Sequence, residues 1–132
     1  MKLLDADIVL IEDDVADALQ FHACLQEVGF IGIFRHFTDG EDFLEFLDSQ
    51  KEPSFFSLFL DLVLPGMSGF DLLEAIRRID PLGEVIRTFI ISSSTDPVNF
   101  QRAQALGVSG YFLKPLFSES FVHSIEQTSF SI

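Results

Sequence analysis

The chain has 132 residues, enough for one domain with a real core and too few for a second domain of ordinary size. Its composition is 48% apolar with 16 phenylalanines, which excludes a disordered chain. Eight basic residues against 21 acidic ones give a formal net charge of −13, which disfavours binding to nucleic acid or to an anionic membrane. Such a charge is typical of a solubilising surface or of a partner with a basic or apolar face.

Cysteine usage and the N-terminus bear on the compartment. The single cysteine, Cys24, excludes an internal disulfide and a multi-cysteine metal site, and it fits a reducing compartment. Asp5 and Asp7 interrupt the apolar run of "MKLLDADIVLIEDD", so it does not read as a signal peptide. No run approaches the length of a membrane span. We therefore expect a cytoplasmic protein that neither binds nucleic acid directly nor enters a membrane.

The first predicted elements are a buried strand and a helix. "DIVLIEDD" (residues 7–14) is a continuous apolar run that ends in acids, as expected for a strand buried on both faces. A stripe at helical spacing follows before Gly29, a good helix stop, and consists of Val15, Ala18, Leu19, His22, Leu25 and Val28.

The same alternation continues to the end of the chain. Further strands are predicted in "IGIFRHF", "SLFLDLVL", "EVIRTFIISS" and "VSGYFL". Helices are predicted in "EDFLEFLDSQ", "SGFDLLEAIRRI", "TDPVNFQRAQALG" and "SESFVHSIEQ", with Asp96 as a cap and Pro97 in the first turn of the fourth. Five strands alternating with five helices predict an α/β fold, a doubly wound parallel sheet, as a single domain over residues 1–132. Its active crevice should lie outside the carboxyl ends of the strands.

Four segments bring polar groups to that edge of the sheet. They supply Glu12, Asp13 and Asp14, then Asp61, then Ser92, Ser93 and Ser94, and finally Lys114. Asp61 stands in an apolar run, where burial of a carboxylate is costly without a compensating partner. Three acids at two strand ends suit Mg²⁺. Taken singly, the acids could also cap helices, Lys114 could be a solvated loop lysine, and Ser92 could bond the backbone.

Four motifs in order carry a family resemblance: "VLIEDD", "LDLVLPGMSG", "IISSS" and "GVSGYFLKP". Asp61 and Ser92 are 31 positions apart, and Ser92 and Lys114 are 22 apart. With these motifs and spacings the chain resembles a response-regulator receiver domain of two-component signalling, of the single-domain, chemotaxis-regulator-like kind. The resemblance implies a flavodoxin-like sheet with five strands in the order 2-1-3-4-5 and five helices.

The resemblance also implies a phosphoacceptor and a metal site. Asp61 would accept a phosphoryl group from a sensor histidine kinase, a histidine phosphotransfer protein or a small phosphodonor. Glu12 and Asp13 would hold Mg²⁺, or Mn²⁺, together with Asp61 and the backbone carbonyl of Val63. Glu12 stands where the family often has Asp. The chain would then be a phosphorylation-activated switch, and not an enzyme beyond its own phosphorylation and slow self-dephosphorylation.

A conformational switch is implied as well. Lys114 and Ser92 would bind the phosphoryl oxygens, and Ser92 with Tyr111 would form the switch that remodels the partner-binding face. Candidates for that face are Val98, Phe100, Tyr111, Phe112, Phe117 and Phe121, although most such aromatics belong to the core of a small domain. The downstream target stays unknown, and the resemblance allows a monomer or a phosphorylation-dependent dimer. Kinase recognition would use exposed residues of the first helix, such as Asp17, Gln20 and Phe21.

Several positions qualify this interpretation. Ser93 is larger than the usual Ala or Gly and is expected to slow phosphoryl access. Neither Val63 nor Ser94 offers a group that orients water, so we expect a long-lived phosphoryl state. A haloacid-dehalogenase-type phosphatase would need a second Asp where Val63 stands. A receiver-like interaction module that is never phosphorylated is the remaining alternative.

Overall fold

The computed structural model describes residues 2–50, 55–83, 85–115 and 119–128. Its strands are β1 (Asp7–Ile11), β2 (Phe34–Phe37), β3 (Phe56–Asp61), β4 (Ile86–Ser92) and β5 (Gly110–Leu113). Its helices are α1 (Val15–Glu27), α2 (Gly40–Ser49), α3 (Gly69–Ile79), α4 (Pro97–Ala105) and α5 (Glu119–Gln127), with a short 3₁₀ helix at Leu3–Asp5. The alternation predicted from the sequence is confirmed, with most strands a few residues shorter than predicted.

All five strands form one parallel sheet in the order β2-β1-β3-β4-β5. The predicted flavodoxin-like order is therefore confirmed. The central strand β3 is buried at every position, which explains its nearly continuous apolar sequence. Because the strands are parallel, the carboxyl ends of β1, β3, β4 and β5 meet at one edge of the sheet.

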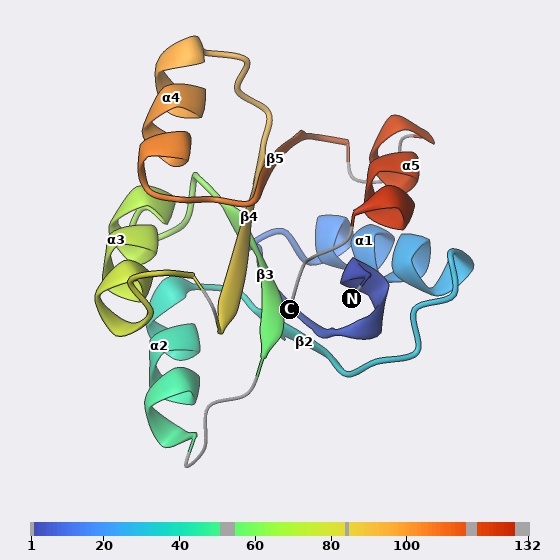
Figure 1. Ribbon diagram of the computed structural model, residues 1–132, viewed down its shortest axis with the longest axis horizontal. Helices are drawn as coiled ribbons and strands as arrows, with labels where there is room; N and C mark the ends of the chain where they lie inside the picture. The colour runs from blue at the N-terminus through green and yellow to red at the C-terminus, as the bar shows by residue number, and fades with distance from the viewer. Residues whose placement is uncertain (1, 51–54, 84, 116–118, 129–132) are drawn as a thin grey trace.

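Helices cover both faces of the sheet (Figure 1). Each face carries an apolar layer between sheet and helices. On one face α2, α3 and α4 pack through residues such as Phe43, Leu72 and Ala103. On the other face α1 and α5 pack through Phe21, Leu25 and Ile125. Within the described part of the chain, none of the helices has both the length and the apolar character that a bilayer crossing demands.

Helix α1 has a different buried face from the one predicted. Phe21 is 0% exposed, whereas Val15 is 56% and Leu19 is 66% exposed. The prediction that Phe21 is an exposed kinase contact is therefore wrong. Apolar residues occupy several faces of this helix, so periodicity alone does not fix its phase. Contacts of Phe21 with Phe59 and Phe121, at centroid distances of 5.0 and 5.7 Å, decide it.

The helices next to the carboxyl edge begin at side-chain caps. Asp14 accepts a hydrogen bond from the Asp17 N–H, and Ser68 accepts one from the Asp71 N–H, both at 3.1 Å. Asp96 accepts from the Val98 N–H at 3.0 Å, with Pro97 in the first turn as predicted. These caps end the loops after β1, β3 and β4 at defined residues, and those loops carry the polar groups described next.

Candidate functional site

Asp61 is the last residue of β3 and is only 6% exposed. Its Oδ1 atom accepts a hydrogen bond from the Val63 N–H at 2.9 Å. Its Oδ2 atom lies 2.7 Å from Nζ of Lys114. The carboxylate that looked misplaced in an apolar strand is therefore compensated on both oxygens, as burial of a charge requires.

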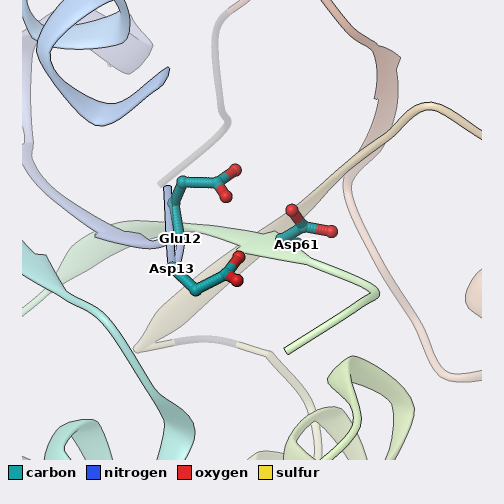
Figure 2. Close-up of side chains that lie close together, drawn as sticks. All are labelled: Glu12, Asp13 and Asp61. Carbon is teal, nitrogen blue, oxygen red and sulfur yellow. The ribbon is translucent and has the colours of Figure 1, made fainter. Parts of the chain in front are cut away.

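Two further carboxylates come from the end of β1. Glu12 is 1% exposed and Asp13 is exposed. One carboxylate oxygen from each of Glu12, Asp13 and Asp61 lies within 4.8 Å of the others. Figure 2 shows the carboxylates of Glu12 and Asp13 extending toward the Asp61 side of the site. The predicted acidic cluster is therefore assembled from two adjacent strand ends.

Lys114 follows β5 and is the cation of this cluster. Its Nζ atom lies 2.7 Å from Asp61 Oδ2, 2.8 Å from Glu12 Oε2 and 3.4 Å from Asp17 Oδ2. Its backbone N–H donates to the Ser92 carbonyl at 2.9 Å, which fixes the loop after β5 against the end of β4. The interpretation of Lys114 as a solvated loop lysine is wrong, because its side chain is only 18% exposed.

Burial dominates the electrostatics of Glu12. Loss of solvent raises the pKa of Glu12 to about 7, although hydrogen bonds from Lys114 and the Asp14 N–H act in the opposite direction and Asp61 adds repulsion. Partial burial alone would lower the pKa of Lys114, but the Asp61 and Glu12 carboxylates outweigh it and raise that pKa, so the ammonium stays charged. The site therefore combines a fixed positive charge with carboxylates that crowd one another.

The donor set fits a hard divalent cation. Glu12 Oε2 is buried, and within the described part of the chain the Lys114 ammonium, 2.8 Å away, is the polar group that meets it. Its other oxygen, Oε1, accepts from the Asp14 N–H at 3.1 Å. A buried carboxylate oxygen with a free lone pair, facing two more carboxylates, is what Mg²⁺ or Mn²⁺ uses as a ligand. Glu12, Asp13 and Asp61 are thus the residues that could hold the metal.

Ser92 ends β4 and is 3% exposed. Its Oγ atom accepts a hydrogen bond from the Ser94 N–H at 3.0 Å. The side chain does bond the backbone, as the simpler interpretation of this serine expected, and it also lines the acidic depression. That depression has a volume of about 550 Å³ and is lined by Glu12, Asp13, Asp14, Asp17, Asp61, Val63, Ser92, Ser93, Ser94 and Lys114.

Tyr111 connects the site to helix α4. Its hydroxyl donates to the Ser94 carbonyl at 3.2 Å, and its ring meets Phe100 edge-on at 5.7 Å between centroids. Phe100 is 44% exposed on α4. Tyr111 therefore contacts both the loop after Ser92 and the surface of α4.

The other residues predicted for the partner-binding face lie partly on the surface and partly in the core. Val98 is 65% exposed on α4, whereas Phe121 is 4% exposed and Phe112 packs against the same core cluster. Phe117 lies outside the described residues. The core interpretation therefore holds for Phe112 and Phe121.

Two residues at the site were not predicted to be there. Asp17 was expected only as an exposed residue of α1, yet it contacts Lys114. Nε2 of His36 on β2 lies 2.7 Å from the Glu12 carbonyl. The only sequence signal for Asp17 is its spacing from Asp14, which capping already explains, and for His36 there is none.

Comparison with known proteins agrees with this geometry. A family model of the response regulator receiver domain matches residues 8–126. The chemotaxis protein CheY of Pseudomonas aeruginosa is 30% identical over 120 residues, which cover 90% of this chain and 93% of that protein. The probable methanogenesis regulatory protein FilR2 of Methanothrix harundinacea is 29% identical over 125 residues, covering 91% of this chain and 79% of that protein.

A solved structure has the same fold. The response regulator receiver domain from Rhodospirillum rubrum superimposes with a TM-score of 0.78 at 29% identity, covering 92% of this chain and 89% of that one. Receiver domains of this family are phosphoacceptor domains in two-component signalling and are generally not enzymes. With a family match that extends over nearly all of its length, the chain belongs to the response regulator receiver domain family.

Proposed function

We propose that the chain is a phosphorylation-activated switch in which Asp61 accepts a phosphoryl group from a histidine kinase or a histidine phosphotransfer protein. The observation that carries this proposal is the position of Lys114 Nζ, 2.7 Å from Asp61 Oδ2, beside the Glu12 and Asp13 carboxylates. A nucleophilic carboxylate, a fixed cation and two further acids in one open depression are the parts that phosphoryl transfer needs.

The transfer step uses the Asp61 carboxylate as the nucleophile. One of its oxygens forms a bond to phosphorus while the bond from phosphorus to the donor's imidazole nitrogen breaks, and the imidazole leaves with the electron pair. Because the nucleophile is already ionised, no general base is required. The Val63 N–H and Lys114 orient the two oxygens of Asp61 before the donor arrives.

Glu12, Asp13, Asp61 and the Val63 backbone carbonyl are the proposed ligands of Mg²⁺ or Mn²⁺. A bound divalent cation would offset the repulsion between these carboxylates and the incoming phosphoryl oxygens. Lys114 would supply a second positive charge to those oxygens, and the Ser92 hydroxyl would turn to donate a hydrogen bond to one of them.

Partner binding is proposed for the surface next to Tyr111. When the Ser92 hydroxyl turns to the phosphoryl group, it leaves its bond to the Ser94 N–H, and the Ser94 carbonyl that receives the Tyr111 hydroxyl moves with the loop. The structure already has a groove of about 430 Å³ there, with Pro97, Phe100 and Tyr111 in its lining. A downstream protein that docks in this groove would detect the phosphorylation state.

Kinase docking is proposed for the exposed side of α1. Val15 and Leu19 are one turn apart on this helix, are exposed, and follow directly on the acidic loop. This apolar pair replaces Phe21 in the predicted contact surface.

We further propose that the protein is cytoplasmic and acts as a single receiver domain. It would be monomeric or dimerise on phosphorylation, and its downstream target is unidentified.

The test is phosphorylation by a small donor. Wild-type protein is incubated with acetyl phosphate and Mg²⁺, with EDTA in a parallel sample, and its intact mass is recorded. The proposal predicts the gain of one phosphoryl group in wild type with Mg²⁺, and none with EDTA or in Asp61→Asn. Asp48→Asn, an exposed aspartate of α2, is the matched control and should be phosphorylated like wild type.

Failure would have a definite form. If folded wild-type protein gains no phosphoryl group from acetyl phosphate or from a phosphorylated histidine phosphotransfer protein, the chain is an interaction module rather than a phosphoacceptor. If Asp61→Asn is labelled as fully as wild type, the nucleophile has been assigned to the wrong residue.

A further inference from the structure

A histidine on the edge strand holds the backbone of the acidic loop. Nε2 of His36 lies 2.7 Å from the carbonyl oxygen of Glu12. A carbonyl oxygen only accepts hydrogen bonds, so this contact requires the proton on Nε2. The two residues are 24 positions apart in the chain, and the pairing of β1 with β2 brings them together.

The His36 contact completes the hydrogen-bond ladder between β1 and β2 at the point where β2 ends. The Glu12 N–H donates to the Phe37 carbonyl at 3.0 Å, one residue after the end of β1. In a continued parallel ladder, the Glu12 carbonyl would accept from a backbone N–H two residues beyond Phe37. Because β2 ends at Phe37, the His36 side chain supplies the donor instead. Both backbone groups of Glu12 are thereby tied to β2.

This attachment acts on the position of two carboxylates. The Glu12 carbonyl belongs to the peptide group that connects Glu12 to Asp13, so fixing it limits the rotation of both residues. Oε1 of Glu12 is occupied by the Asp14 N–H at 3.1 Å, which leaves the buried Oε2 facing the site. With the peptide released, the carboxylates could separate, and repulsion among three acids favours that movement.

We propose that His36 is a positioning residue for the divalent cation: through the Glu12 carbonyl it keeps the Glu12 and Asp13 carboxylates preorganised opposite Asp61. This inference rests on the proposed function of these three acids as metal ligands. Groups that orient a metal ligand by hydrogen bonding, without touching the metal, commonly contribute about tenfold or more to metal affinity. His36 would act without touching the metal or the phosphoryl group.

The experiment compares two replacements of His36. His36→Phe keeps a ring of similar shape and removes the donor, whereas His36→Gln keeps an N–H donor at similar reach. His22→Phe is the matched control, because His22 stacks on Phe34 on the same side of the sheet and has no contact with the acidic loop in the described structure. The dissociation constant of Mg²⁺ is measured on the unphosphorylated proteins by isothermal titration calorimetry, and the melting temperature is recorded alongside it.

We expect His36→Phe to weaken Mg²⁺ binding by roughly tenfold and His36→Gln to restore it to within about threefold of wild type. His22→Phe should bind like wild type. In acetyl phosphate assays His36→Phe should need more Mg²⁺ for half of its maximal rate, with the rate at saturating Mg²⁺ nearly unchanged. If His36→Phe does not fold, His36→Met, whose flexible side chain fills the same space, takes its place.

Two results with the variants would overturn the inference. Wild-type Mg²⁺ affinity in folded His36→Phe would show that the carbonyl contact does not position the ligands. A loss in His36→Gln equal to that in His36→Phe, with unchanged melting temperature, would show that the donated hydrogen bond is not what matters. Wild-type protein that binds no Mg²⁺ would instead remove the proposed metal site itself, and this inference with it.

Discussion

Protonation of Glu12 links the stability of the protein to pH. Its carboxylate is buried, and burial raises its pKa from the ordinary value of 4.5 to about 7 despite the ammonium of Lys114 beside it. An acid whose pKa is higher in the folded than in the unfolded protein binds protons more tightly when folded. Without metal, the contribution of Glu12 to the free energy of unfolding therefore falls as the pH rises from about 4.5 through 7.

Replacing Glu12 by glutamine, which has nearly the same shape and no charge, should recover the stability lost at high pH. We expect Glu12→Gln, in EDTA at pH 8, to raise the free energy of unfolding by about 1–3 kcal/mol, because the unfavourable ionised form is removed. The gain should shrink toward zero near pH 5, where wild-type Glu12 is protonated. Urea unfolding at both pH values measures it. A Glu12→Gln protein that is less stable than wild type at pH 8 would mean that the ion pair with Lys114 outweighs the burial.

Val63 sets the expected lifetime of the phosphoryl group. Its side chain is 78% exposed at the mouth of the site and has no group that could orient a water molecule. We expect Val63→Asn to hydrolyse its phosphoryl group several-fold faster than wild type, because an amide can hold the attacking water. Release of phosphate after removal of acetyl phosphate measures the rate. Val63→Ala, which adds no polar group, is the control, and wild-type hydrolysis within seconds in Mg²⁺ would contradict the prediction of a long-lived state.

Helix α3 packs on the end of β3 with no space for a side chain. A Cβ atom at Gly69 would lie 2.5 Å from the Asp61 carbonyl oxygen and 2.6 Å from Leu62 Cα. Gly69→Ala should therefore push the helix away from β3, lowering the free energy of unfolding by roughly 2–4 kcal/mol and slowing the proposed phosphorylation of Asp61. Chemical unfolding and the acetyl phosphate assay measure both effects.

Gly66, in the loop that joins β3 to α3, is the control for this prediction. It has a φ of +78°, and a Cβ atom at this position would meet no other atom within 4 Å, so Gly66→Ala introduces backbone strain without a clash. We expect a loss of about 1–2 kcal/mol there. Equal losses in the two variants would show that close packing of α3 on Asp61 does not govern stability.

The elements differ in how well the sequence predicts them. The strands and their order follow from apolar runs that end in polar residues, because a parallel sheet needs both features. The buried face of α1 does not follow, since Leu19 and Phe21 are both apolar and only the packing of Phe21 against Phe59 decides between them.

The same distinction applies to the site. Asp61, Glu12, Asp13, Ser92 and Lys114 could be predicted to share one edge, because each lies at or just beyond the end of a strand of one parallel sheet. The contacts of Asp17 with Lys114 and of His36 with Glu12 could not, because they join residues 97 and 24 positions apart through geometry that no local pattern encodes.

At the scale of the whole molecule, charge repulsion is the main electrostatic feature. A formal net charge of −13 on 132 residues, with acids concentrated at one sheet edge, should oppose folding at low ionic strength. We expect MgCl₂ to stabilise the protein more than NaCl of equal ionic strength, by about 1.4 kcal/mol at a concentration tenfold above its dissociation constant. Thermal unfolding measures this difference. Asp13→Asn should lose the extra stabilisation by MgCl₂ and keep the stabilisation by NaCl. If the difference between the two salts is the same in Asp13→Asn as in wild type, the metal binds elsewhere.

The central claim is that Asp61 is the residue that carries the phosphoryl group, and chemical trapping tests it most directly. Protein phosphorylated by acetyl phosphate in Mg²⁺ is reduced with borohydride, which converts an acyl phosphate to an alcohol, and is then digested and sequenced by mass spectrometry. The account predicts homoserine at position 61 and unmodified residues at Glu12 and Asp13. Reduction at Glu12 or Asp13, with Asp61 intact, would contradict it.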